Sequence, residues 1–142
     1  MDQQPCAALI KQLNDAIEKN ANNHVRSDNL TLTQIALLVT LDRVGQHGMT
    51  VRDISQAMHI QQPTATGIVQ RLVEKAYVMA SNLSEDRRMK VIHLTEAGRD
   101  KANVAQQAMT VTENTLLSSL DKEERTTFRH LLEKALKNVR QD

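Results

Sequence analysis

The chain has 142 residues, of which 40% are hydrophobic and 25% are charged, and its formal net charge is +1. This length suits one domain that buries about two-thirds of the surface of its unfolded chain, and the ordinary composition argues against wholesale disorder. Because the chain has no Trp, one Tyr and one Phe, the core is expected to consist of aliphatic side chains and Met packed between helices.

The composition also bears on the cellular compartment. The amino terminus lacks a basic start followed by an apolar stretch, and no run of about 18 apolar residues occurs, so neither a signal peptide nor a membrane span is expected. We therefore expect a cytoplasmic protein. The single cysteine, Cys6, excludes an internal disulfide and a zinc site built on a cysteine pair.

Charge is unevenly distributed along the chain. Residues 1–49 hold four basic and five acidic side chains, residues 50–94 hold six and four, and residues 95–142 hold eight and eight. Only the middle third is positive, which makes it the expected contact region for a polyanion such as nucleic acid.

Three helices are predicted in the first part of the chain. Apolar side chains recur at helical spacing after Pro5, up to about residues 22–23. A second helix is expected to begin with the Thr-x-x-Gln spacing of a capping box at residue 31 and to end at Gly45. A third, short helix over about 50–58 begins with Thr-x-x-Asp, the same capping signature.

A second short helix follows across a turn of about three or four residues, which makes a helix-turn-helix. In this helix Gln61 or Gln62 would precede Pro63 at the first helical position. Its core face would consist of Ile68, Val69, Leu72 and Val73. Alternating apolar residues then predict two strands over 77–83 and 89–94, the second carrying Lys90, with the polar residues 84–88 at the hairpin tip.

The carboxyl-terminal third is predicted to form two further helices. The first begins at Thr95 and continues to about Ser119, which is about 37 Å at 1.5 Å per residue. The second begins at a capping box formed by Asp121 and Glu124. Its apolar face consists of Phe128, Leu131, Leu132, Ala135, Leu136 and Val139. Long, weakly apolar helices at both ends of the chain predict a homodimer in which these helices interdigitate.

Two short helices followed by a hairpin with a basic tip are the elements of a winged helix-turn-helix. The second helix of such a unit fits the major groove of duplex DNA, where Gln and Thr can read base edges. An arginine at the hairpin tip can enter a narrow minor groove. The candidate DNA-binding residues are Arg52, Gln61, Gln62, Thr64, Thr66, Gln70, Arg71, Arg87, Arg88 and Lys90. Simple solvation is the alternative interpretation of these polar side chains.

Residues 84–98, SEDRRMKVIHLTEAG, closely resemble the wing signature of the MarR family, which is Asp-x-Arg followed by Leu-Thr-x-x-Gly. The segments 30–41 and 50–58 are also similar to family segments and occur in the same order. The resemblance covers essentially the whole chain. It implies a homodimer that binds operator DNA, with Arg88 as the wing arginine and Asp86 as the carboxylate that orients it.

The expected fold class is mainly α, of the α+β type. A single domain over residues 1–142 would combine a winged helix-turn-helix lobe at about 30–95 with dimerisation helices at about 5–24 and 96–140. Two residues depart from the family pattern, because Gly67 and Ala80 stand where relatives often carry arginine. These departures place the DNA affinity and the operator sequence in question, and the glycine hints at close backbone approach to DNA.

The expected function is a repressor relieved by a small molecule lodged between the dimer helices and the DNA-binding lobe, with ligand-binding residues unknown. Activation is not distinguished from repression by the sequence. Two alternatives stay open on the same scaffold. One is a winged-helix protein-interaction module without DNA binding, and the other is a thiol or metal sensor.

The sensor alternatives have weak support in the sequence. Cys6 has Lys11 as its only cationic neighbour in sequence, which is more typical of an inert thiol. The five histidines form no i, i+4 pair, although His24, Asp28 and His130 could converge in a dimer. No phosphate-binding loop or Gly-x-Ser-x-Gly occurs, so we expect neither an enzyme nor a cofactor. Two aromatic residues cannot build a stacking platform for single strands, so duplex DNA is the expected nucleic acid.

Overall fold

The structure is a computed structural model that describes residues 3–25, 29–82 and 89–140. The elements in chain order are α1 (Cys6–His24), α2 (Leu32–Val44), the 3-10 turn η1 (Gly45–His47), β1 (Met49–Thr50), α3 (Val51–Met58), α4 (Gln62–Glu74), β2 (Val78–Ser81), β3 (Val91–Leu94), α5 (Glu96–Leu117) and α6 (Lys122–Arg140). The predicted fold class, mainly α with a small sheet, is confirmed.

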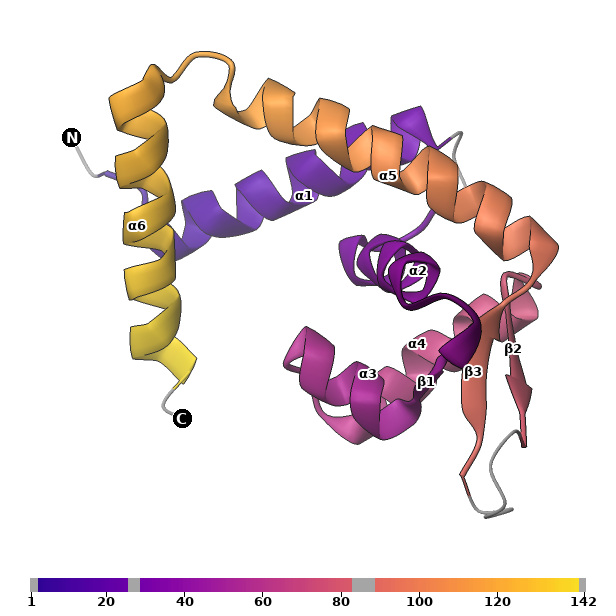
Figure 1. Cartoon of the computed structure of the whole chain (residues 1–142). Coiled ribbons are helices and arrows are strands. Elements are labelled where there is room, and N and C mark those ends of the chain that lie inside the picture. Colours follow the sequence, from indigo (N-terminus) through magenta and orange to yellow (C-terminus); the bar gives the residue numbers. More distant parts are fainter. Residues whose placement is uncertain (1–2, 26–28, 83–88, 141–142) are drawn as a thin grey trace.

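The helices surround α2, which lies at the centre of the described chain (Figure 1). Helices α1 and α2 both pack on α5, while α3, α4 and the sheet form a lobe on the other side of α2. Helix α5 runs from the sheet to α6, which stands at the far side of the molecule from the strands. The winged lobe and the terminal helices are therefore joined mainly through α2 and α5.

The core is aliphatic, as the composition predicted. Its largest fully buried side chains are Val25, Leu30, Ile35, Leu37, Leu38, Leu41, Ile54 and Leu72. Four of these belong to α2, and this helix is buried on more than one face because α5 covers it from one side and the lobe from the other. Burial of this apolar surface is the main favourable contribution to folding.

The predicted capping boxes are present. Thr31 Oγ1 accepts from the backbone N–H of Gln34 at 3.1 Å, and the Gln34 side chain accepts from the backbone N–H of Thr31 at 3.1 Å. Thr50 with Asp53 and Asp121 with Glu124 make the same reciprocal pairs. Each box satisfies backbone donors that a helix start would leave free, which explains why these helix starts were predictable.

The sheet has the strand order β1-β3-β2 and is antiparallel. Strand β1 was not predicted, because two residues are too few to show an alternating pattern; it pairs Met49 with Ile92. The other two strands are shorter than predicted, and Lys90 precedes β3 rather than lying on it. The predicted hairpin tip, 84–88, lies outside the described residues.

Two helix ends also differ slightly from the predictions. Helix α4 starts at Gln62 with Gln61 as its N-cap, so Pro63 occupies the second helical position instead of the first. Helix α5 ends at Leu117, two residues before the predicted end at Ser119. Helix ends fray, so a shift of one or two residues at an end leaves the helix otherwise as predicted.

The start of α5 is tied to the turn between α4 and β2. Thr95 donates its backbone N–H to the carbonyl of Tyr77 at 3.0 Å and its hydroxyl to the carbonyl of Ala76 at 2.6 Å. The same hydroxyl accepts from the backbone N–H of Gly98 at 3.0 Å, which caps α5. A Cβ at Gly98 would overlap the carbonyl oxygen of Tyr77, so only glycine permits this approach.

Gly98→Ala is expected to lower the free energy of unfolding by about 2 kcal/mol or more, because a backbone carbonyl cannot move aside as a flexible side chain can. Urea unfolding followed by circular dichroism measures this loss. Gly67→Ala is the matched control, since nothing lies within 4 Å of a Cβ at that helical position. The control should raise stability by about 0.5–1 kcal/mol. Equal stabilities for the two variants would contradict the packing argument.

Candidate nucleic-acid interface

Helices α3 and α4 meet across the three residues 59–61, as the helix-turn-helix pattern predicted. His59 adopts the left-handed conformation with φ of 55°, and the backbone N–H of Ile60 donates to the carbonyl of Ser55 at 3.0 Å. These features end α3 and turn the chain sharply into α4. The turn therefore fixes the direction of α4 relative to the lobe.

Helix α4 buries one face and leaves the other in solvent. The buried residues are Ala65, Ile68, Val69 and Leu72. Val73, which was predicted to belong to this core face, is instead 45% exposed. The contact between α4 and α3 anchors the buried face, so the opposite face is free to enter a groove.

The candidate base-reading residues all lie on exposed positions. Those on α4 or its N-cap are Gln61, Gln62, Thr64, Thr66, Gln70 and Arg71. Within the described part of the chain none of these side chains has a hydrogen-bond or ion-pair partner. Gln61 in particular caps α4 through its backbone alone. A row of amide, hydroxyl and guanidinium groups is thus available for an external partner.

The remaining candidate residues lie around this helix or outside the described residues. Arg52 is exposed on α3, and Lys90 is exposed immediately before β3. Asp86, Arg87 and Arg88 lie outside the described residues, so the structure does not bring them together with α4. Strands β2 and β3 extend from the same lobe as α3 and α4 (Figure 1).

Both departures from the family pattern face outward. A Cβ at Gly67 would meet nothing within 4 Å, and Ala80 is exposed on β2. Neither small residue is therefore demanded by packing inside this chain. The exposed surface is correspondingly poorer in cations than a surface with arginine at both positions.

One residue near α4 escaped the sequence analysis. Arg140, the last described residue of α6, lines a hollow of about 560 Å³ together with Gln61, Gln62 and Thr64. Arg140 and the amino terminus of α4 therefore line the same hollow. No sequence signal could have predicted this neighbourhood, because it depends on how α6 is oriented relative to the lobe.

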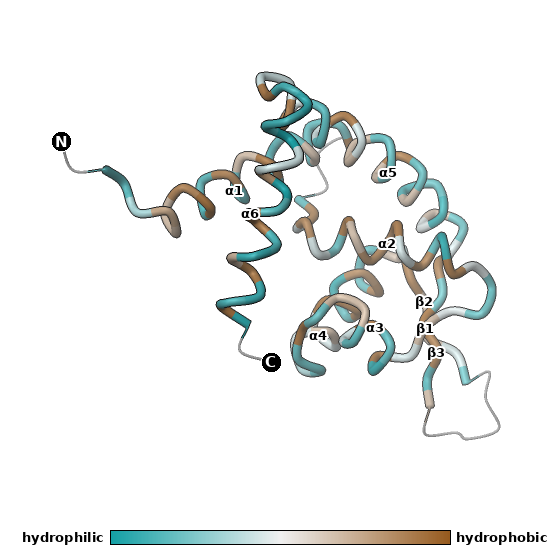
Figure 2. The backbone as a smooth tube through the Cα atoms, turned by 60° about the vertical axis from the view of Figure 1, so that its left-hand side comes forward, coloured by the Kyte–Doolittle hydropathy of each residue, from teal (hydrophilic) through white to brown (hydrophobic). Residues whose placement is uncertain are grey.

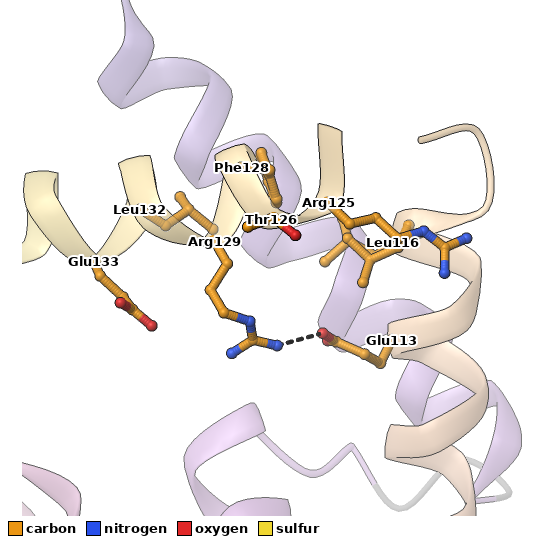
Figure 3. Close-up of a pocket in the computed structure, with 9 residues that line it drawn as sticks. Glu113, Leu116, Arg125, Thr126, Phe128, Arg129, Leu132 and Glu133 are labelled. Carbon is orange, nitrogen blue, oxygen red and sulfur yellow. Dashed lines mark ion pairs between the residues drawn. The ribbon is translucent and has the colours of Figure 1, made fainter. Parts of the chain in front are cut away.

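The terminal helices expose a second kind of surface. In Figure 3, Leu116 of α5 and Phe128 and Leu132 of α6 line a hollow of about 360 Å³, beside an ion pair between Glu113 and Arg129 at 3.8 Å. Hydrophobic residues recur along α1 and α6 (Figure 2), and several of them are exposed. They are Leu9, Ile10 and Leu13 on α1, and Leu131, Leu132, Leu136 and Val139 on α6.

The positions of the cysteine and of the metal-binding residue types bear on the two sensor alternatives. Cys6 is exposed at the first position of α1. Among residues 3–25, 29–82 and 89–140, no three His, Cys, Asp or Glu side chains are grouped so that they could hold a metal ion. Asp28, one of the three residues that could converge in a dimer, lies outside these ranges. In the same ranges, every helix is too short or too polar to cross a membrane.

Comparisons with known proteins agree with this geometry. The model of the MarR family matches residues 30–90. The uncharacterised HTH-type transcriptional regulator YwoH of Bacillus subtilis (strain 168) is 30% identical over 126 residues, which are 87% of this chain and 90% of that protein.

Two solved structures share the fold. A MepR–DNA complex from S. aureus has a TM-score of 0.84 at 24% identity, over 96% of this chain and 99% of that chain. A mutant MarR from E. coli complexed with operator DNA has a TM-score of 0.77 at 22% identity, over 93% of this chain and 94% of that chain. The helix-turn-helix geometry, the family match and the relative together lead to one conclusion: the chain belongs to the MarR family and is a DNA-binding transcriptional regulator.

Proposed function

We propose that the chain acts as a homodimeric repressor that recognises a specific operator in duplex DNA and is released from it by a small molecule. The observation that carries this proposal is α4, whose apolar face is buried while the candidate base-reading side chains on its polar face are exposed and have no partner among residues 3–25, 29–82 and 89–140. As a bacterial regulator it works in the cytoplasm, and it is not an enzyme. The DNA complexes of MepR and of mutant MarR, which have the same fold, support the choice of DNA as partner.

Sequence recognition is assigned to Gln61, Gln62, Thr64, Thr66 and Gln70. Gln can bond adenine through two hydrogen bonds, and Thr can bond a base edge or contact the thymine methyl group. Basic side chains of the lobe contribute phosphate contacts that position the helix without reading sequence. These cations are Arg52, Arg71, Arg87, Arg88 and Lys90.

The division of the single domain 1–142 follows from the same assignment. The winged lobe, about 30–95, makes the DNA contacts. The helices at about 5–24 and 96–140 form the dimer interface. No residue of α6 is buried in the isolated chain, so its apolar face needs a second copy to cover it. Two-fold symmetry then sets the two copies of α4 about 34–36 Å apart, one turn of DNA.

A second candidate function is a winged-helix module that binds protein and not DNA. The observation that favours it is the lack of arginine at Gly67 and Ala80. A mobility-shift assay with the DNA upstream of the gene distinguishes the two, because the protein module would leave that DNA unshifted at all protein concentrations. Whether the regulator represses or activates follows from where that DNA is bound relative to the promoter.

Replacing Leu132 and Leu136 together by Lys is expected to convert the dimer into monomer, because each copy would then bring two cations into an apolar contact. Sedimentation equilibrium measures the change, and circular dichroism checks that the helices persist. Lys134→Glu on the polar side of α6 is the control and should remain dimeric. A dimer that survives the double substitution would exclude α6 from the interface.

Gln62→Ala and Thr66→Ala are expected to relax base preference at defined operator positions while leaving folding intact, since both side chains are exposed. Each lost base contact should reduce discrimination by about 1–3 kcal/mol, measured as the affinity difference between operator and single-base variants. Glu74→Ala, at the carboxyl end of α4, serves as the control. A uniform loss across all sequences would assign these residues to the phosphate backbone.

Arg88→Ala is expected to weaken operator binding and to make its salt dependence shallower by about two units, because the dimer loses two phosphate-type contacts. Operator titrations at several salt concentrations measure the slope. Arg43→Ala, exposed at the end of α2, is the matched control and should leave the slope unchanged. If Arg88 only pairs with Asp86 in solvent, both affinity and slope will equal those of the wild type.

A further inference from the structure

A hollow of about 570 Å³ lies at the base of the wing, between α2, the strands and α5. We call it the wing-root hollow and define it by Leu41 and Asp42 of α2, Met79 and Ser81 of β2, His93 of β3 and Arg99 of α5. Its volume falls in the range of small-molecule sites. It contains none of the residues named above as DNA contacts, and of the helices assigned to the dimer it includes only Arg99, near the start of α5.

Two of the residues that line it each carry a buried polar atom that lacks a partner within the described ranges. Ser81 Oγ and His93 Nε2 are buried, and neither finds a hydrogen-bond partner among the described residues. The strand register explains why the two residues share a face. Met79 lies directly across from His93, and Ser81 follows Met79 by two residues, so all three side chains point to one face of the sheet. Ile92 is adjacent to His93 in sequence, so its buried side chain points to the other face. Buried polar atoms are nearly always paired, so two unpaired atoms beside one hollow indicate that a partner is missing there.

The charges around the hollow are of opposite sign and free. Asp42 lies on its α2 side and Arg99 on its α5 side, and neither forms an ion pair or side-chain hydrogen bond within the described part of the chain. A ligand with only a carboxylate would meet Arg99 favourably but would also face Asp42. A ligand with only an ammonium group has the opposite conflict, so charge complementarity favours a molecule that carries both groups.

We propose that the wing-root hollow binds a small zwitterion with an apolar part, of the class of aliphatic α-amino acids. Arg99 holds the carboxylate and Asp42 holds the ammonium group, each through a charge-assisted hydrogen bond. Leu41 and Met79 cover the apolar side chain. Ser81 and His93 complete the polar wall when a small shift of the strands opens their buried atoms to the ligand.

The consequence for regulation rests on the proposed repressor function. A zwitterion in this hollow would contact β2, β3 and the first turn of α5 at the same time. It would therefore favour one position of the two strands relative to α5. Such a ligand changes operator affinity to the extent that it binds the two wing positions differently. Binding itself needs no DNA and is tested separately.

The test is a titration of the full-length protein by ¹H–¹⁵N NMR in the absence of DNA, with L-leucine as the probe. Its two halves serve as matched probes: 4-methylpentanoate lacks the ammonium group, and 3-methylbutylamine lacks the carboxylate. We expect saturable shifts of the Ser81 and His93 signals with L-leucine, and about tenfold weaker binding for each half, because each loses one charge-assisted contact.

Variants assign the contacts. Arg99→Gln and Asp42→Asn should each weaken L-leucine binding at least tenfold, whereas the exposed neighbours Arg43→Gln and Asp100→Asn should bind as the wild type does. Absence of saturable shifts, equal affinity for all three probes, or unchanged binding by both site variants would overturn the proposal. An operator titration run in parallel separates the two hypotheses. Operator binding without leucine binding overturns only the wing-root site, and leucine binding without operator binding overturns only the repressor function.

Discussion

The first turn of α5 lies directly against the carbonyl of Tyr77, and much of the molecule depends on that contact. Thr95 bonds the turn before β2 and caps α5 with the same hydroxyl, while Gly98 provides the space for the approach. The contact fixes the direction in which α5 leaves the sheet. Helices α1 and α2 pack on α5, so the direction of α5 also influences the angle between the winged lobe and the terminal helices. That direction requires glycine at position 98.

One terminal helix, α6, lacks a buried apolar face within the described part of the single chain. Helix α6 begins with a complete capping box, yet none of its side chains is buried. Caps and helix propensity contribute little compared with the burial of an apolar face, so most of the stabilisation of such a helix must come from packing on another surface. In a homodimer, the surface that stabilises α6 would also set the spacing of the two recognition helices. The stability of α6 and the spacing of the two recognition helices on DNA would then both depend on the dimer contact.

Features encoded by neighbouring residues could be predicted from the sequence, and features encoded by the tertiary arrangement could not. Thr31 and Thr50 each find their capping partner three residues away, so both helix starts were correct. Strand β1 could not be predicted, because its two residues are defined as a strand only by their pairing with β3. The approach of Arg140 to Gln61 and the meeting of Asp42 with Arg99 around one hollow join segments far apart in sequence, for which a single sequence carries no periodic signal.

The absence of arginine at Gly67 and Ala80 has a consequence for how a regulator of this kind would find its operator. Non-specific binding to DNA comes almost entirely from phosphate contacts, whereas discrimination comes from base edges. With Gly67 and Ala80 in place of side chains that could carry charge, the lobe retains its polar, uncharged groups on α4. A missing phosphate contact removes the same free energy from the operator complex and from the complex with random DNA, so both affinities fall by the same factor while the base contacts are kept. A lobe that lacks these two cations would therefore bind all DNA less tightly but keep its ratio of specific to non-specific binding, which is the quantity that decides occupancy among many competing genomic sites.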